Sequence, residues 1–147
     1  MPGRTASEGQ SPYAVIIACS DSKVIPEAIF SAGIGSLFVI RTAGNTIGPN
    51  ELGSIEYAVG HLGCPLVVVL GHTHCGAVDA AMHGEAEGHV ATIIKEIQSS
   101  IKSETDAKKT SIIYAEHSAS VISENISGVK VVPALYDIET GRVEWLS

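Results

Sequence analysis

Cysteine is scarce in this sequence and its number is odd: Cys19, Cys64 and Cys75 are the only three among 147 residues. A disulfide framework needs paired cysteines, and a chain of this length buries enough surface to fold without one. We therefore expect the three thiols to be reduced, as they would be in a cytoplasm, and free to bind a metal.

Basic residues and long apolar runs are scarce as well. Nine Lys and Arg residues stand against sixteen Asp and Glu residues, a net charge of −7. Because a negative surface repels phosphate backbones, this balance argues against nucleic acid as a partner. Apolar runs such as 65–70 are far too short to cross a membrane, and residues 1–12 contain no apolar core of a secretory signal. We expect a cytoplasmic protein with no membrane partner.

What the sequence does contain is a series of short, predominantly apolar runs. Four of them cover residues 13–18, 37–41, 65–71 and 129–136. Such runs are typical of strands buried on both faces, which indicates a parallel sheet. Between the runs, helical spacing of apolar residues predicts helices over 26–32, 50–61, 89–101 and 118–126. The polar segment 102–110 is expected to be a loop.

The end of the chain has a different pattern. A turn over 137–141 joins the fourth run to residues 142–146, so the last strand should run antiparallel at the sheet edge. The whole pattern predicts an α/β fold with a Rossmann-like, mostly parallel sheet, made of four parallel strands plus an antiparallel C-terminal edge strand and flanked by helices. We expect a flexible N-terminal tail over 1–12 and a single domain over 13–147.

Two motifs stand where apolar strands are expected to end: Cys19-Ser-Asp-Ser-Lys23 and His72-Thr-His-Cys75. Open parallel sheets bind ligands at the carboxyl ends of strands, where the strand order reverses. If the first and third strands are neighbours there, Cys19, His72 and Cys75 converge. Two thiolates and an imidazole suit Zn²⁺, and three protein ligands leave the open position of a catalytic site. Taken singly, each would be interpreted as an ordinary core or loop residue.

Both motifs resemble those of a known family. Cys19-Ser-Asp-Ser-Lys23 resembles the Cys-x-Asp-x-Arg motif of β-class carbonic anhydrases, and residues 71–76 resemble their Gly-His-x-x-Cys-Gly motif. Residues 39–45 look like the family's Arg-x-Ala-Gly-Asn segment, and 134–143 are similar to its closing hairpin. Arg41 in that segment is expected at the end of the second strand, at an interface or on the surface.

The resemblance implies reversible hydration of CO₂ to bicarbonate, with Zn²⁺ as the cofactor. It implies that Cys19, His72 and Cys75 hold the metal. It also implies that Asp21 is catalytic, accepting a hydrogen bond from the zinc-bound water in the active state and becoming a fourth metal ligand in a closed state. An alternative role for Asp21 is to cap a helix that begins near residue 26. The substrate pocket is expected to include Gly44, Asn45 and Gly76. Because the family is built from dimers, a homodimer or a dimer of dimers is expected.

Lys23 departs from the family pattern, in which this residue is Arg. Arginine would grip Asp21 with two parallel hydrogen bonds, whereas lysine offers one compact charge. We therefore expect Lys23 to be a catalytic partner of Asp21 that holds its carboxylate less firmly than the family arginine would. Two alternatives stay open: hydrolysis of carbonyl sulfide or carbon disulfide at the same zinc site, or a weakly active, zinc-binding regulatory protein. Nucleotide binding is disfavoured, because residues 33–35 form a lone Gly-x-Gly that precedes a strand.

Overall fold

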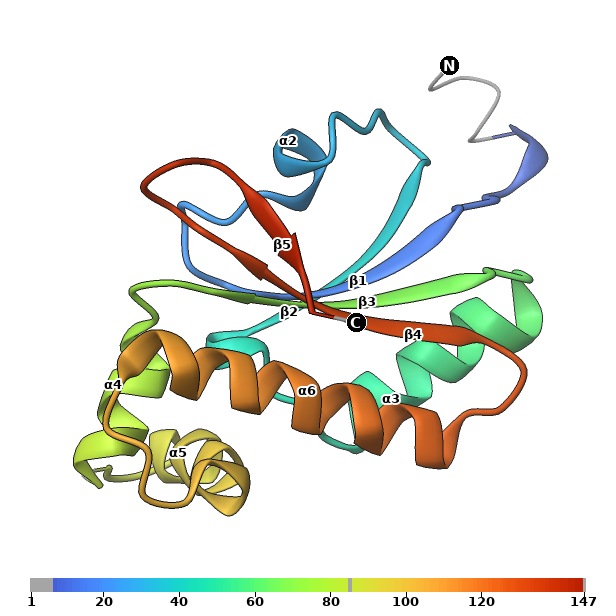
Figure 1. The fold of residues 1–147 in the computed structure, drawn as a ribbon. Helices are drawn as coiled ribbons and strands as arrows, with labels where there is room; N and C mark the ends of the chain where they lie inside the picture. The colour runs from blue at the N-terminus through green and yellow to red at the C-terminus, as the bar shows by residue number, and fades with distance from the viewer. Residues whose placement is uncertain (1–6, 85, 147) are drawn as a thin grey trace.

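The computed structural model describes residues 7–84 and 86–146 and shows one five-stranded sheet in the order β2-β1-β3-β4-β5 (Figure 1). Strands β1 to β4 are parallel, and β5 runs antiparallel to β4, as predicted. Residues 1–6 of the predicted tail and residues 85 and 147 of the predicted domain lie outside the described residues. The strands are β1 (Ala14–Cys19), β2 (Leu37–Thr42), β3 (Leu66–His72), β4 (Lys130–Tyr136) and β5 (Val143–Trp145).

The central strands are covered on both faces. All six residues of β1 are buried, and β3 is buried from Val67 to His72. A strand covered on both sides needs apolar residues at nearly every position rather than at alternate ones. This is why β1 and β3 are unbroken apolar runs in the sequence, and it places their carboxyl ends in the middle of the sheet.

Helices cover the two faces unequally. One face carries most of the helices, and the other is covered by a short helix and the hairpin that ends in β5 (Figure 1). The first group is α3 (Pro49–Glu56), α4 (Gly76–His83), α5 (Val90–Ile101) and α6 (Ala107–Asn125), and the short helix is α2 (Pro26–Ile29). Among the described residues, no helix has both the length and the apolar character that crossing a membrane requires.

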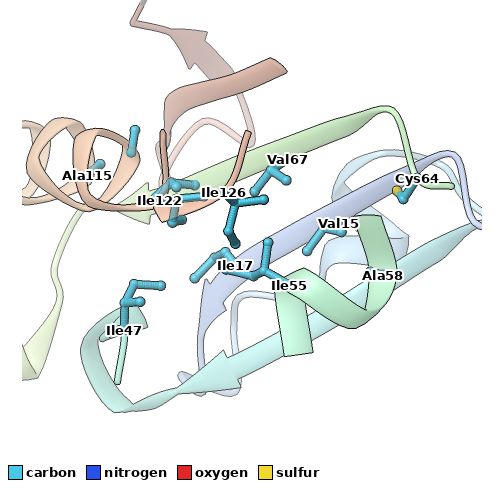
Figure 2. Packing of buried hydrophobic residues seen from close by; sticks show 12 residues of the cluster. Val15, Ile17, Ile47, Ile55, Ala58, Cys64, Val67, Ala115, Ile122 and Ile126 are labelled. Carbon is cyan, nitrogen blue, oxygen red and sulfur yellow. The ribbon is translucent and has the colours of Figure 1, made fainter. Parts of the chain in front are cut away.

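The helix-rich face contains a buried cluster that fixes α3 and α6 to the sheet (Figure 2). Ile55 of α3 and Ile122 of α6 are fully buried, and the cluster also contains Ile17 of β1 and Val67 of β3. Burying one such side chain contributes about 1.5–3 kcal/mol. The two helices are therefore held firmly against the strands whose ends carry the two motifs.

Helix α6 corrects two predictions. It begins at Ala107, inside the segment 102–110 that was expected to be a loop, and it has 19 residues instead of covering only 118–126. The Asp106 carboxylate accepts a hydrogen bond from the Lys109 amide at 2.9 Å and caps the helix. Its inner face includes the buried polar residues Thr110, Ser111 and Ser118. Because these residues interrupt the apolar spacing, the first half of the helix was not recognised in the sequence.

Two shorter helices also differ from the predictions. Helix α2 ends at Ile29 rather than at residue 32, and its N-cap is Ile25, so Asp21 does not cap it. Helix α4 was not predicted, because its eight residues are mostly small and carry no broad apolar stripe. It ends at Gly84, whose left-handed backbone (φ 77°) is a common helix terminator.

Candidate metal centre

Two neighbouring strands bring both motifs to the same place. β1 pairs in parallel with β3, and the strand order reverses between them. Cys19 is the last residue of β1 and His72 is the last residue of β3. Both therefore lie at the crevice where open α/β sheets bind ligands. Cys75 follows three residues later, at the N-cap position of α4.

The three side chains converge in a buried group. Their ligand atoms, two sulfurs and one imidazole nitrogen, all lie within 4.8 Å of one another. Cys19 and Cys75 are each 6% exposed, and His72 is 1% exposed. Within residues 7–84 and 86–146, no other group of three or more His, Cys, Asp or Glu residues is arranged to hold a metal ion. The structure thus brings together the three residues that the sequence proposed as ligands.

The His72 ring is oriented by the residue that follows it. Nδ1 lies 2.7 Å from the Thr73 carbonyl oxygen, so this nitrogen carries the proton and donates it. Nε2 is buried and has no hydrogen-bond partner among the described residues. Leaving such an atom unsatisfied costs about 1–3 kcal/mol, and a metal ion would satisfy it. The tautomer present is therefore the one that a metal ligand requires.

Thr73 in turn is fixed by the C-terminal hairpin. Its amide donates to the Tyr136 carbonyl oxygen at 3.0 Å, and its hydroxyl accepts a hydrogen bond from the Ile138 amide at 3.1 Å. Through these two hydrogen bonds and the one from the His72 ring to its carbonyl, Thr73 connects the C-terminal hairpin to His72. Because hydrogen bonds of this outer kind orient metal ligands, the hairpin is part of the support of the site.

The two sulfurs differ in their surroundings. The backbone amides of Gly44 and Asp21 donate to Cys19 Sγ at 3.3 and 3.4 Å. A hydrogen bond from Cys75 is the strongest of the effects that lower the pKa of Cys19 to about 3. The same bond, together with burial, raises the pKa of Cys75. The two sulfurs therefore titrate as a coupled pair, in which a negative charge on one sulfur is stabilised by the other.

The charge of this group and its donor atoms both fit a divalent cation. Burial lowers the pKa of His72, but the Cys19 sulfur, the Thr73 carbonyl and the Asp21 carboxylate together outweigh burial and leave that pKa raised. A shared negative charge on two sulfurs, next to an imidazole nitrogen, is a donor set that suits Zn²⁺. Because these ligands number three, a fourth position is available to water or substrate.

Asp21 lies beside this group and is held by Lys23. The Lys23 amide donates to Asp21 Oδ1 at 2.8 Å, and it is the main cause that keeps the pKa of Asp21 below its ordinary value. Lys23 Nζ lies 2.9 Å from Oδ1 and 3.2 Å from Oδ2, so one nitrogen faces both oxygens. The lysine side chain is 61% exposed, and water weakens an ion pair of this kind. The expectation that Lys23 holds Asp21 less firmly than an arginine would stays a prediction.

Arg41 is a contact of the first motif that the sequence did not reveal. Its Nε donates to the Cys19 carbonyl oxygen at 3.0 Å, and its Nη2 donates to the Asp21 carbonyl oxygen at 2.8 Å. The strand register pairs Arg41 with Ala18, directly before the motif. The only signal for this contact was the alignment of β1 with β2, which a sequence without the structure does not fix.

Gly44 and Asn45 are the buried residues of the turn Ala43–Asn45, next to the candidate metal ligands. Gly44 has a left-handed backbone (φ 71°), and a Cβ atom there would lie 2.9 Å from both Ala77 Cβ and Ile97 Cδ1. Its amide is directed at the Cys19 sulfur. Gly44 thus contacts a candidate ligand through its amide, and the pocket role expected for Gly44 and Asn45 stays a prediction.

Gly76 lines a surface hollow on the Cys75 side of the site. The hollow has a volume of about 480 Å³ and is also lined by Cys75, His74, Lys108 and Glu139. Gly76 is exposed, as the first residue of α4. Its position is compatible with a substrate pocket, a role that stays a prediction.

Comparison with known proteins identifies the family. A family profile described as carbonic anhydrase matches residues 14–128. Carbonic anhydrase 2 of Mycobacterium tuberculosis is 40% identical over 155 residues, covering 91% of this chain and 74% of that protein. A carbonic anhydrase of Mycolicibacterium smegmatis is 51% identical over 84 residues, covering 57% of this chain and 41% of that protein.

Solved structures agree with the sequence comparison. One of two tetrameric β-carbonic anhydrases of Sordaria macrospora superposes with a TM-score of 0.87 at 27% identity, covering 99% of this chain and 85% of that one. The Coccomyxa β-carbonic anhydrase in complex with acetazolamide has the same fold, with a TM-score of 0.86 at 24% identity, covering 98% and 77% of the two chains. With its Cys-His-Cys group at the carboxyl ends of β1 and β3, this chain belongs to the β-class carbonic anhydrases and is an enzyme of that family.

Proposed function

We propose that this enzyme catalyses the zinc-dependent, reversible hydration of CO₂ to bicarbonate and a proton. The observation that carries the proposal is the buried convergence of Cys19, His72 and Cys75, with Nε2 of His72 left without a partner. The relatives that are named carbonic anhydrases support it. When bound, Zn²⁺ supplies the Lewis acidity that makes water a nucleophile near neutral pH.

The side chains of this chain then have separate tasks. The sulfurs of Cys19 and Cys75 and Nε2 of His72 hold the metal. In the open state, Asp21 accepts a hydrogen bond from the attacking water and orients it. In a closed state, the same carboxylate becomes a fourth ligand and excludes the substrate. Lys23 favours the open state, because its amide and ammonium groups both hold the Asp21 carboxylate.

The remaining features of the proposal concern the pocket, the assembly and the compartment. The substrate pocket includes Gly44, Asn45 and Gly76. The enzyme is a homodimer or a dimer of dimers, supported by exposed apolar side chains such as Ile34 (72% exposed) and Trp145 (56% exposed), which a subunit contact would cover. It is cytoplasmic, which fits its three free cysteines. Light scattering on the purified protein tests the assembly.

The central experiment is stopped-flow CO₂ hydration on protein whose zinc content has been measured. We expect about one zinc per chain and rapid turnover in the native enzyme. Cys75→Ser should lose both, because it removes one of three ligands. Cys64→Ser is the matched control: Cys64 is also buried (2% exposed) but lies outside the group, so zinc and turnover should be retained.

Three results would contradict the proposal. Full zinc content in Cys75→Ser would show that the metal binds elsewhere. Full zinc without CO₂ turnover would favour the regulatory alternative. Faster hydrolysis of carbonyl sulfide or carbon disulfide than hydration of CO₂ would show that the site serves a different substrate.

A further inference from the structure

The guanidinium group of Arg41 connects the end of β2 to the turn that follows β1. It donates one hydrogen bond to the carbonyl of Cys19 and one to the carbonyl of Asp21, at 3.0 and 2.8 Å. Both acceptors are backbone atoms, so the contacts fix the course of the turn rather than a single side chain. The guanidinium fork is rigid, and hydrogen bonds from a charged donor are about twice as strong as neutral ones.

The turn fixed in this way carries two groups of the site. In the proposed function, Cys19 is a metal ligand, and Asp21 determines whether the fourth metal position is open to substrate. The Asp21 carbonyl accepts from the Val24 amide at 2.9 Å and from Arg41, while the Asp21 carboxylate accepts from Lys23. Arg41 therefore holds the backbone of Asp21, and Lys23 holds its side chain.

The hold through the Lys23 side chain is weaker than the one that an arginine would provide. Its ammonium group is exposed and supplies a single charged nitrogen in place of the two that arginine would provide. For Asp21 to reach the metal of the proposed function, its carboxylate would leave Lys23, and a rotation of the turn toward the sulfurs would bring it closer. The second movement is the one that Arg41 opposes, because rotating the Asp21 peptide breaks its bond to Nη2.

We propose that Arg41 is a positioning residue that keeps Asp21 away from the metal by fixing the backbone of the Cys19–Asp21 turn. This inference rests on the proposed function, since it assumes a metal at Cys19, His72 and Cys75. Lys23 holds the side chain of Asp21 away from the metal, and Arg41 would contribute to the same effect by holding the backbone.

The test measures how easily an added anion reaches the fourth metal position. Cobalt replaces zinc, and azide is titrated while the visible cobalt spectrum is recorded. When Asp21 occupies the metal, only the open fraction binds azide, so the apparent Kd rises as that fraction falls. We expect Arg41→Gln to raise the apparent Kd by up to about tenfold, which corresponds to about 1.4 kcal/mol. Lys130→Gln, which removes a positive charge at the exposed first residue of β4, should leave it unchanged.

A double-mutant cycle decides whether Arg41 acts through Asp21. In an Asp21→Asn background the competing carboxylate is gone, so Arg41→Gln should no longer change azide affinity. Arg41→Lys, which keeps the charge but loses the fork, should give an intermediate increase in the Asp21 background. An equal effect of Arg41→Gln in both backgrounds would overturn the proposal, because Arg41 would then act on the site without Asp21.

Other outcomes also separate this proposal from the proposed function. Unchanged azide affinity in Arg41→Gln, with cobalt fully bound, would refute the role of Arg41 and leave the metal site intact. Loss of cobalt or of native circular dichroism in both Arg41→Gln and Arg41→Lys would show that Arg41 supports the fold rather than the position of Asp21. Cobalt retained in Cys75→Ser would instead refute the proposed site itself.

Discussion

Replacing Gly44 by alanine should damage both the fold and the metal site. The left-handed backbone (φ 71°) costs alanine about 1–2 kcal/mol. The added Cβ would meet Ala77 Cβ and Ile97 Cδ1 at 2.9 Å, and overpacking of a core costs about 1–3 kcal/mol. We therefore expect the free energy of unfolding to fall by about 2–5 kcal/mol. Zinc affinity should fall by about 10–100-fold, the usual effect of losing an outer contact such as the amide that donates to Cys19 Sγ.

The assay is urea unfolding followed by circular dichroism, together with competition for zinc against a chelator. Gly53→Ala is the matched control, since Gly53 lies inside α3 and a Cβ there would meet no heavy atom within 4 Å. That substitution should raise the free energy of unfolding by about 0.5–1 kcal/mol, because alanine loses less entropy than glycine in a helix. If Gly44→Ala and Gly53→Ala unfold at the same urea concentration and bind zinc equally well, the argument from backbone strain and crowding is wrong.

Three further predictions concern side chains. Lys23→Arg replaces the single charged nitrogen beside Asp21 with two, so we expect faster CO₂ hydration at equal zinc content in stopped-flow measurements. An unchanged rate would mean that one ammonium group suffices. Asp106→Ala removes the cap that accepts the Lys109 amide, and urea unfolding should show a loss of about 1 kcal/mol. The Glu139 amide, which donates to Asp137 at 2.9 Å, keeps the pKa of Asp137 below its ordinary value. Because the folded-state pKa is the lower one, this contribution to stability is present above about pH 4 and is lost as the pH falls through the folded-state pKa. In Asp137→Asn, the free energy of unfolding should therefore fall less steeply as the pH is lowered below about 4. An unchanged dependence of this free energy on pH would exclude the contribution of Asp137.

The strands could be predicted from the sequence because burial on both faces leaves a simple pattern. β1 and β3 need apolar residues at successive positions, and the sequence supplies them. Helix α6 could not be predicted in full, because Thr110, Ser111 and Ser118 face the protein interior and remove the apolar stripe. Its packing is determined by the shape of small residues against the sheet, as at Gly71, where a Cβ would lie 3.3 Å from the Ser111 carbonyl oxygen.

The candidate ligands could be recognised because each stands at or just beyond a strand end. Cys19 and His72 required only that β1 and β3 be neighbours, which the structure confirms. The contacts of Arg41 and Gly44 could not be found in this way. The contacts of Arg41 depend on how the end of β2 lies against the end of β1. Both sets of contacts also involve backbone atoms, which are the same in every residue and therefore leave no pattern in the sequence. Sequence patterns identify donor side chains, whereas the supports of those side chains require coordinates.

The link from the C-terminal hairpin to His72 has a consequence for the order of events during synthesis. Tyr136 and Ile138, which fix Thr73 and through it the imidazole, leave the ribosome more than a hundred residues after Cys19. Until β4 docks beside β3, a nascent chain therefore presents Cys19 and Cys75 as unprotected thiols, with no oriented histidine between them. If the proposed function holds, we therefore expect metal loading to be a late step, which completes the folding of this chain rather than starting it.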